Sequence, residues 1–575
     1  MSAWGATLTA PGRARFRIWA PARKAITLEI DGAAPLAMTA AADGWFEAEA
    51  PAGVGTRYRY RLDAETAVAD PASRAQDGDV HGWSLVVDPA AYAWQNQDWR
   101  GRPWAETVLW ECHAGLLGGF SGVAERLVGL AALGITAIEL MPVNAFSGTR
   151  NWGYDGVLPY APAATYGTPD DLRALIDAAH GHGISVLLDV VYNHFGPDGN
   201  YLNAYAPGFF DEGKHTPWGG AVAVQKPQVA DFFKDNARMW IEEYRIDGLR
   251  FDAVHAIRND GFLDDLAASI RGQVPEGRHV HLVLENENND AERLAEGKYD
   301  GQWNDDFHNV LHVLLTGERD AYYQDFADEP EAKLARCLSQ GFIYQGDPSP
   351  NHDGEPRGKP SGHLPATRFV SFLQNHDQVG NRALGERLTL LTAKEKLRAA
   401  TALLLLSPQI PLIFMGDAEG SEAPFLFFTD FHDELADAVR NGRRKEFAKF
   451  AAFASEADRE KIPDPNAKGT FDASFPARGP QADEWQGFYR DWLTLRREHI
   501  VPRLEGTCGE GADVIGDKAV LARWRMGDGA RLTIALNLGD APVAVDNAGE
   551  PLASVGGGVA DGRLAPASLS AWLEA

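Results

Sequence analysis

The middle of this chain repeats one pattern eight times: an apolar, strand-like run followed by a segment with helical apolar periodicity. The strand-like runs are TVLWECHA, TAIELMPV, SVLLDVVYNH, GLRFDAVH, HVHLVLENE, YDGQWN, RFVSFLQNHD and QIPLIFMGD. Strands that are apolar along their whole length are typical of a parallel sheet with helices on both faces. Eight such units predict an α/β fold with a closed (β/α)8 TIM barrel over residues 105–495. A doubly wound open sheet is the runner-up, but no GxGxxG motif follows the first strand.

Short alternating runs without helical periodicity flank this region. Residues 1–95 contain ARFRIWAP, AITLEI, GWFEAEAP and TRYRYRL, which predict an N-terminal β-sandwich of carbohydrate-binding or immunoglobulin-like type. Residues 500–575 contain AVLARWRM, ARLTIALNL and APVAVD, which predict a small C-terminal β domain. The loops at 195–227 and 342–366 are long for a compact domain, and such loops usually carry function or move.

Charge and cysteine content limit the partners and the compartment. A formal net charge of −27 argues against a nucleic-acid backbone or an anionic membrane as the main partner. The three cysteines, Cys112, Cys337 and Cys508, lie far apart and form no CxxC motif, which favours a reduced compartment. No apolar run is long enough for a secretory signal or a membrane span. We therefore expect a cytoplasmic protein with neither nucleic acid nor membrane as its partner.

Polar side chains gather where four of the predicted strands end, and catalytic groups of TIM barrels come from the C-terminal ends of strands. One such strand end is explained by a buried ion pair or a helix N-cap, but four on one rim predict an active site. The third strand ends in Asp189, Tyr192, Asn193 and His194, the fourth in Arg250, Asp252 and His255, the fifth in Glu285, Asn286 and Glu287, and the seventh in Asn375, His376 and Asp377.

The pair Arg250 and Asp252 suggests the chemistry of this rim. Strand side chains alternate between faces, so these two point the same way, and opposite charges inside a core strand are costly unless they serve a purpose. Two carboxyl groups of different protonation state suit glycoside hydrolysis. Arg250 would keep Asp252 ionised, while nearby carboxylates would raise the pKa of Glu285. Glu287 shares the strand face of Glu285, so alternation alone does not separate them.

Other candidate sites have simpler explanations. His180 and His182 end a predicted helix beside a glycine, which favours a C-cap over a metal site. His279 and His281 stand at the start of a strand and have no third ligand in view. GLLGGFSG lacks the Lys-Ser/Thr of a phosphate-binding loop, and RNGRRKEF is typical of a solvated helix face. The sequence thus predicts neither a metal nor a cofactor.

Three aromatic residues lie just past strand ends, namely Trp152, Tyr154 and Trp303. Each is explained equally well by packing in the core and by stacking on a sugar ring. Both interpretations stay open for all three.

Four motifs, DVVYNH, GLRFDAVH, LEN and FLQNHD, occur in the order and on the strands of the signature regions of the α-amylase family of glycoside hydrolases, family 13, which this chain resembles. The resemblance implies that Asp252 is the nucleophile, Glu285 the general acid/base and Asp377 the carboxylate that braces the distorted sugar. It places the acid at the head of the third region, which favours Glu285 over Glu287. The predicted substrate-binding residues are Arg250, His194, His376, Tyr154, Asp189, Trp152 and His255.

Within this family the likeness is greatest to members that release trehalose from maltooligosyltrehalose. It rests on stretches such as ELMPVNAFSGTRNWGYDGVLPYAP, QWNDDFHNVLHVLLTGE and FLQNHDQVGNRALGERL. It implies hydrolysis of an α-1,4 bond with retained configuration, no cofactor, and the synthase that makes maltooligosyltrehalose as a pathway partner. Two stretches depart from the pattern: HAGLLGGFSG is short, and FMGDAEGSEAPF lacks the usual Glu-Glu-Trp run. Both stretches border the substrate cleft, so the resemblance does not determine which residues bind the aglycone.

Three rival interpretations remain. A glycogen or starch branching transferase shares the layout and the nucleophile, and differs in that a sugar hydroxyl intercepts the glycosyl-enzyme. Another hydrolase of α-1,4-glucan oligosaccharides would use the same groups on a different substrate. A non-catalytic glycan-binding protein would have no need of Asp252, Glu285 and Asp377 together.

Overall fold

The computed structural model describes residues 4–216, 219–257, 259–546 and 549–575. Within them, eight parallel strands close into a barrel in chain order, which confirms the predicted TIM barrel. Every residue of these strands is buried, which explains why their sequences are apolar without alternation. The strands are β11 (Leu109–Cys112), β12 (Ala137–Leu140), β15 (Ser185–Val190), β18 (Gly248–Phe251), β19 (His281–Leu284), β20 (Gly301–Trp303), β23 (Phe369–Ser371) and β24 (Ile410–Phe414).

Helices surround the barrel at the predicted places after seven of the strands. They are α1 (Gly119–Ala124) and α2 (Leu127–Leu133), then α3 (Pro169–Gly181), α5 (Pro227–Glu243), α7 (Asp260–Arg271), α8 (Asp305–Thr316), α12 (Lys394–Leu406) and α16 (Ala482–Leu495).

The eightfold pattern also predicts a helix after β19, in the stretch DAERLAEG, and this prediction is wrong. The structure has only a 3-10 turn, η4 (Ala291–Leu294), in which the Asp290 side chain accepts a hydrogen bond from the Glu292 backbone N–H. Gly297 follows at φ 81°, a left-handed conformation that stops a helix. The stretch is therefore too short and too well capped to form a regular helix.

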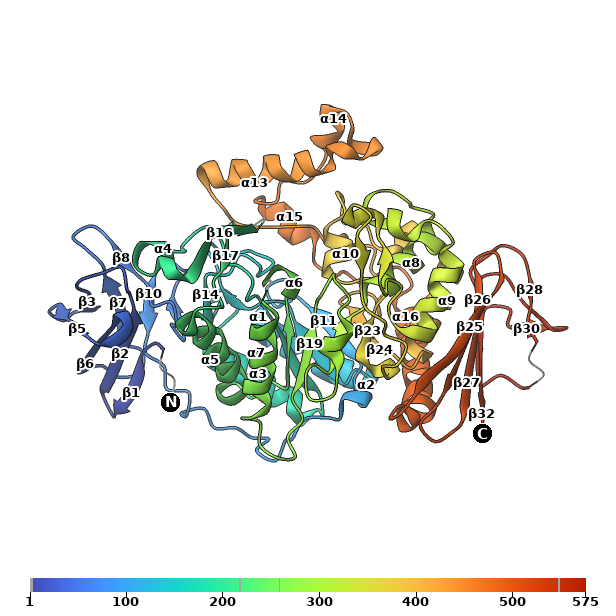
Figure 1. Cartoon of the computed structure of the whole chain (residues 1–575), viewed down its shortest axis with the longest axis horizontal. Helices are drawn as coiled ribbons and strands as arrows, with labels where there is room; N and C mark the ends of the chain where they lie inside the picture. Colours follow the sequence, from blue (N-terminus) through green and yellow to red (C-terminus); the bar gives the residue numbers. More distant parts are fainter. Residues whose placement is uncertain (1–3, 217–218, 258, 547–548) are drawn as a thin grey trace.

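The N-terminal region forms two stacked sheets, as expected, and lies at one end of the molecule (Figure 1). The Phe16 and Tyr58 rings, 4.8 Å apart, come from different sheets and meet in the core between them. One sheet contains β1 (Thr7–Ala10), β2 (Arg13–Trp19), β6 (Trp45–Pro51) and β5 (Thr39–Ala40); the other contains β4 (Leu36–Ala37), β3 (Thr27–Ile30), β7 (Arg57–Arg61), β8 (Ala67–Val68), β10 (Trp83–Leu85) and β9 (Gln76–Asp77).

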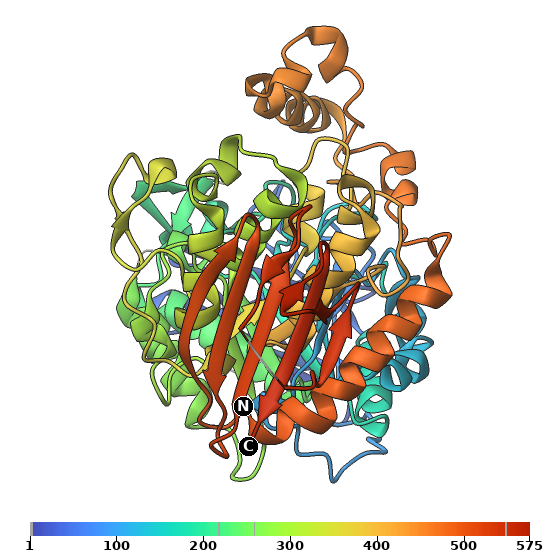
Figure 2. The same ribbon diagram turned by 90° about the vertical axis from the view of Figure 1, so that its right-hand side faces the viewer.

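A C-terminal sheet lies at the opposite end of the molecule and turns one face outward (Figures 1 and 2). It packs on the barrel through α9 (Pro330–Gln340), a helix the sequence analysis did not predict, and Trp524 Nε1 donates to the Leu338 carbonyl over 3.0 Å. The sheet contains β25 (Cys508–Gly516), β26 (Ala519–Arg525), β27 (Arg531–Asn537), β32 (Ser568–Glu574) and β29 (Ala553–Val555), beside a smaller one of β28 (Val543–Ala544), β31 (Arg563–Leu564) and β30 (Val559–Ala560).

The long loops and the insertion that extend from the barrel follow the C-terminal ends of its strands. The long 195–227 loop contains α4 (Leu202–Tyr205), β16 (Phe210–Thr216) and β17 (Gly219–Val222), and the 342–366 loop contains β21 (Asp347–Pro348) and β22 (Pro356–Arg357). After β24 the chain leaves the body as an arm of α13 (Asp433–Glu446), α14 (Glu456–Arg459) and α15 (Lys468–Ala473) (Figure 1).

The RNGRRKEF stretch ends α13 and is not entirely a solvated face. Arg443 is buried, and its Nη2 donates to the Gly380 carbonyl over 2.6 Å, which ties the arm to the loop after β23. Among the described residues, no helix is both long enough and apolar enough to cross a membrane.

Candidate active site

Arg250, on β18, is the centre of the polar cluster inside the barrel rim. It is fully buried; its Nη1 lies 2.7 Å from Asp189 Oδ2 and 2.8 Å from Asp252 Oδ1, and its Nη2 lies 3.1 Å from Glu285 Oε2. The guanidinium also stacks 3.9 Å above the Trp303 ring. One cation therefore fixes three carboxyl groups from adjacent strands, because charged hydrogen bonds to a rigid guanidinium constrain geometry strongly.

Asp252 stands directly after the end of β18, and its side chain is 11% exposed. Asn193 Nδ2 donates to Asp252 Oδ2 over 2.8 Å. Burial alone would raise the pKa of Asp252, but the charges of Arg250 and His194 and the hydrogen bond from Asn193 hold it below its usual range. At neutral pH this group is therefore a carboxylate, and a small part of it is exposed to solvent.

Glu285 follows β19 and has the opposite character. Burial raises its pKa well above the usual range, and the charges of Asp252 and Asp377 add to this in spite of Arg250. Its Oε2 accepts a 2.7 Å hydrogen bond from the backbone N–H of Ala253, where the chain bends sharply at φ 38°. A protonated carboxyl thus stands beside an ionised one, the combination that separates acid from nucleophile in glycosidases.

Glu287 lies outside this cluster, although it shares a strand face with Glu285. Its side chain is 53% exposed, and its carboxylate lies 3.6 Å from His255 and 3.6 Å from His352. The geometry therefore separates two glutamates that spacing alone did not. His255, one of the predicted substrate-binding residues, contacts Glu287 at the outer edge of the site.

The end of β23 delivers His376 and Asp377 at the start of α10 (His376–Gly380). Asn375 caps this helix, since its side chain accepts from the Asp377 and Gln378 backbone N–H groups. His376 Nδ1 lies 2.5 Å from Glu111 Oε1, and its Nε2 lies 3.4 Å from Asp377 Oδ1. Burial alone would lower the pKa of His376, but the carboxylates of Asp377 and Glu111 raise it to about 9. His376 is thus a cation at neutral pH.

Tyr154 closes one wall of the site. Its hydroxyl donates to Asp189 Oδ2 over 2.6 Å, and its ring stacks on His376 with 5.1 Å between centroids. His194 Nε2 lies 2.8 Å from the Tyr154 carbonyl oxygen. Burial raises the pKa of Asp189 to about 6, against the effect of Arg250. The third, fourth and seventh strands therefore converge on one network, as predicted.

Trp152 and Trp303 support this network from behind. Trp152 is 4% exposed; it meets His376 edge-on at 5.5 Å, and its Nε1 donates to the Leu426 carbonyl. Trp303 is 1% exposed beneath Arg250, so for this residue packing is the correct alternative. The predicted role of Trp152 in substrate binding stays a prediction.

Two buried glutamates at the site were missed by the sequence analysis. Glu111 on β11 and Glu139 on β12 face each other in register inside the barrel. Neither Glu139 oxygen has a hydrogen-bond partner among the described residues, and burial, followed by the charge of Glu111, raises its pKa well above the usual range. An isolated acid within each apolar run, ELMPV and LWEC, was a signal that could have identified both.

Asp305 and Tyr322 were also missed, and no local pattern marks them. Asp305 begins α8, and burial together with the charge of Asp377 raises its pKa to about 7. Tyr322 is 57% exposed; burial and the charge of Glu446 raise the pKa of its hydroxyl, and Asp377 and Glu287 add smaller effects. The residue therefore lies near the carboxylates and is partly accessible to solvent.

The histidines set aside in the sequence take structural positions. His180 Nε2 lies 2.8 Å from Asp247 Oδ2 while its ring stacks on Trp99, and His281 Nε2 contacts the Arg102 carbonyl. In the part of the chain that the structure describes, no group of three or more His, Cys, Asp or Glu side chains is arranged to hold a metal ion.

Comparison with known proteins places this geometry in a family. The family model described as "Alpha amylase, catalytic domain" matches residues 72–207, and one described as "Domain of unknown function (DUF3459)" matches residues 509–570. Malto-oligosyltrehalose trehalohydrolase of Deinococcus radiodurans is 39% identical over 92% of this chain and 90% of its own length. The protein of that name from Saccharolobus solfataricus is 38% identical over 84% of this chain and 85% of its own. The chain belongs to the malto-oligosyltrehalose trehalohydrolase family.

Family membership confirms the resemblance to α-amylase-type glycoside hydrolases. A crystal structure from Salmonella typhimurium, provisionally described as an alpha amylase, superposes with a TM-score of 0.94 at 43% identity and covers the whole of both chains. The similarity to the Deinococcus radiodurans protein covers 92% of this chain, so it extends beyond the barrel of residues 105–495.

Proposed function

We propose that the protein is a retaining glycosidase that cleaves the α-1,4-glucosidic bond next to the terminal trehalose of maltooligosyltrehalose. The products are trehalose and a maltooligosaccharide. The observation that supports this best is the pair of carboxyl groups on one guanidinium: Asp252, whose pKa is lowered, and Glu285, whose pKa is raised. Membership of the trehalohydrolase family supplies the substrate.

Asp252 attacks the anomeric carbon, and Glu285 gives its proton to the leaving glycosidic oxygen. The resulting glycosyl ester on Asp252 is then hydrolysed by water, whose proton returns to Glu285. Two inversions leave the configuration unchanged, and retaining enzymes hold the two carboxyl groups about 5–5.5 Å apart. Contact of both groups with Arg250 favours this close spacing over the wider separation of inverting enzymes.

The remaining predicted residues hold the attacked sugar. Asp377, 35% exposed and 3.4 Å from the cationic His376, is placed to accept hydrogen bonds from sugar hydroxyls and to brace the distorted ring. Tyr154 offers a ring, and His194 a polar edge, to the same sugar. Asp189 and Arg250 orient the nucleophile from below. Trp152 lies behind them, and His255 lies beside them at the outer edge of the site.

On the aglycone side, the exposed ring of Tyr322 is placed to contact the trehalose rings. We infer a cytoplasmic enzyme that needs no cofactor and acts after a synthase that forms maltooligosyltrehalose. A neutral oligosaccharide substrate is compatible with a net charge of −27, which would repel nucleic acids and anionic lipids.

The decisive experiment identifies the products made from maltooligosyltrehalose. We expect free trehalose together with a maltooligosaccharide whose new reducing end is first released in the α-configuration, and no product from Asp252→Asn. Formation of new α-1,6 branches from amylose, without release of trehalose, would instead establish a branching transferase. Binding of the substrate without any turnover would indicate a glycan-binding protein.

A further inference from the structure

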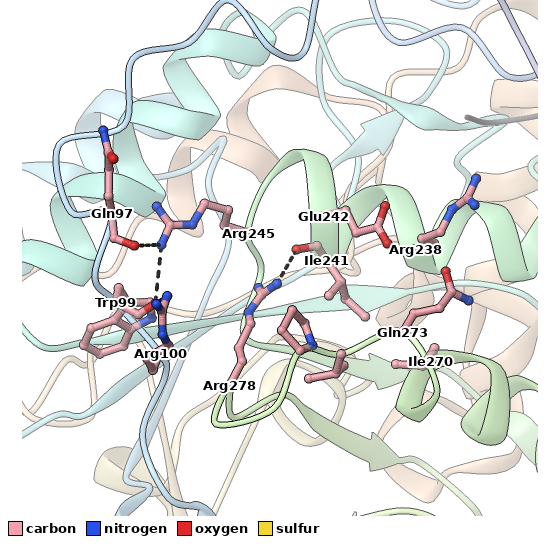
Figure 3. Close-up of a pocket in the computed structure, with 12 residues that line it drawn as sticks. Gln97, Trp99, Arg100, Arg238, Ile241, Glu242, Arg245, Ile270, Gln273 and Arg278 are labelled. Atoms are coloured by element: carbon pink, nitrogen blue, oxygen red, sulfur yellow. Dashed lines mark hydrogen bonds between the residues drawn. The ribbon is translucent and has the colours of Figure 1, made fainter.

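Figure 3 shows a cavity of about 440 Å³. Its lining residues precede β18 and β19, whereas Asp252 follows β18, so the cavity lies at the other end of the barrel from Asp252. It opens between the C-terminal ends of α5 and α7, where the chain approaches the first residues of β18 and β19. The segment 97–100, which links the sandwich to the barrel, forms its third wall. No sequence motif pointed to this place, and the proposed glycosidase chemistry does not use it.

Three arginines, Arg100, Arg245 and Arg278, line the cavity from three different segments (Figure 3). None of them has a carboxylate within ion-pair distance in the described part of the chain, although Glu242 also lines the cavity. A fourth lining arginine, Arg238, is paired with Asp235 on its own helix. On a chain of net charge −27, three cations left without carboxylate partners around one hollow are an exception to the overall charge.

The arginines are close enough to affect one another. Burial lowers the pKa of Arg278, and the charges of Arg245 and Arg100 lower it further, while Asp247 and Glu242 act in the opposite direction. Asp247 is already engaged, since its Oδ1 accepts from Trp99 Nε1 over 2.9 Å. An anion between the guanidinium groups would relieve their repulsion.

Capping of carbonyl groups explains only part of this arrangement. Arg278 donates to the Ile241 and Ile246 carbonyls over 3.0 and 2.9 Å, and Arg245 Nη2 donates to the carbonyls of Gln97 and Trp99. A guanidinium has five N–H donors, so most of the donors on Arg245 remain for a ligand. A purely structural role also requires no hollow between the side chains.

We propose that this cavity binds a small phosphate ester of phosphosugar size. The phosphate group would lie among Arg100, Arg245 and Arg278, whose planar donors match its oxygens. The organic part would lie against the apolar and amide side of the lining, which consists of Ile241, Ile270, Val274, Pro275, Gln97 and Gln273. The volume falls in the range of about 300–1,000 Å³ that is typical of small-molecule sites and leaves room beyond a bare phosphate. This proposal does not rest on the proposed function.

Titration calorimetry on the full chain tests the proposal with glucose 6-phosphate, inorganic phosphate and glucose as probes. We expect saturable binding of glucose 6-phosphate at one site, weaker binding of inorganic phosphate, and none of glucose. In Arg100→Gln/Arg245→Gln the affinity for glucose 6-phosphate should fall by about tenfold or more for each charged hydrogen bond that is lost. The control Arg13→Gln/Arg497→Gln removes the same charge from exposed positions elsewhere and should bind like the unaltered chain.

Three results would overturn the proposal. They are no saturable binding of glucose 6-phosphate up to about 10 mM, beyond the millimolar affinities of weak sites; equal loss in both double variants; or inorganic phosphate bound as tightly as the ester. Circular-dichroism melting and glucan hydrolysis by each variant establish that it is folded, because neither altered arginine belongs to the catalytic rim.

Discussion

At the residue scale, the chemistry of the site follows from a shortage of positive charge. Arg250 contacts Asp189, Asp252 and Glu285, and a single cation cannot neutralise three buried carboxylates. Protons must make up the difference. The protons bind the carboxyl groups whose negative charge is least well stabilised, which are Glu285 and, in part, Asp189. Asp252 stays ionised because the hydrogen bond from Asn193 and the charge of His194 stabilise its carboxylate in addition to Arg250. Burial thus produces an acid and a nucleophile from the same type of side chain.

The identity of the acid is tested by comparing Glu285→Gln with Glu287→Gln. We expect Glu285→Gln to lower kcat by about 10²–10⁴-fold on maltooligosyltrehalose, the usual contribution of a positioned proton donor. A substrate with a good leaving group needs no proton, so its glycosylation step should be largely restored. Glu287→Gln, matched in chemistry and two residues away, should stay near normal on both substrates. The opposite pattern would move the acid role to Glu287.

Asp305 should contribute to the alkaline limit of activity. Burial raises the pKa of Glu285 most, and the charges of Asp252, Asp377 and Asp305 add to it; Glu285 must be protonated to act, so activity falls as pH rises through that pKa. Removing the charge in Asp305→Asn should therefore shift the alkaline limb of kcat/KM toward lower pH and leave the acidic limb, set by Asp252, largely in place. Asp98→Asn removes the same charge in the exposed linker and should change neither limb. An unmoved alkaline limb would exclude this coupling.

At the scale of elements, periodicity predicted the parts of the chain that have a buried face. α3 and α7 each repeat apolar residues toward the barrel, and their strands are buried on both sides, so both kinds of element left a clear pattern. α9 was missed because its buried residues, Leu334, Cys337 and Leu338 among them, are interspersed with charges. Its neighbour, the C-terminal sheet, is about 170 residues away in sequence and no local pattern shows it.

The residues of the candidate site also fall into those that the sequence could predict and those that it could not. Groups at strand ends, such as Asp252 and Asp377, could be predicted because strand direction and alternation fix their rim. Tyr322 and Asp305 could not, because the position of a loop or a first helical turn relative to the rim depends on long-range packing. The choice between Glu285 and Glu287 likewise required the turn at Ala253, whose N–H holds the Glu285 carboxyl.

Helix α3 offers a test of local capping. The Thr168 hydroxyl accepts from the Asp171 N–H over 3.1 Å, and the Asp171 carboxylate accepts from the Thr168 N–H over 2.8 Å. Thr168→Ala should cost about 1 kcal/mol of barrel stability and lower the melting temperature by up to about 2 °C in calorimetry. Ser455→Ala removes the same kind of cap from α14, on the projecting arm, and should leave the melting temperature unchanged. Equal effects would mean that arm and barrel unfold together.

At the scale of the whole molecule, burial also raises the pKa of carboxyl groups that lie outside the catalytic rim. Burial raises the pKa of Asp70 to about 6 and that of Asp417 to about 7. A carboxyl whose pKa is raised on folding contributes stability that is full below its unfolded pKa and is lost as pH rises through the folded one. Glu318, whose pKa falls to about 2 beside His312 and Arg382, acts in the opposite sense and loses its contribution only in acid below its unfolded pKa.

The raised pKa of these carboxyl groups stabilises the folded state near pH 5 relative to pH 8, whereas buried histidines with lowered pKa, such as His113 at about 4, act in the opposite direction, so the carboxyl contribution has to be measured by substitution. Asp70 is a clean probe, because the groups that donate to it, the Tyr58 and Tyr60 hydroxyls and the Ala72 N–H, are neutral. Because pH 5 already lies above the unfolded pKa of about 3.9, only the interval from pH 5 to the folded pKa of about 6 counts, and Asp70→Asn should remove up to about 1.4 kcal/mol of the loss between these two pH values. The exposed Asp63, whose pKa is lowered, provides the control Asp63→Asn, which should leave that loss intact. Calorimetric melting of the unaltered chain and the two variants at both pH values measures this difference, and an Asp70→Asn variant whose stability changes between pH 5 and pH 8 as much as that of the unaltered chain would contradict the assignment.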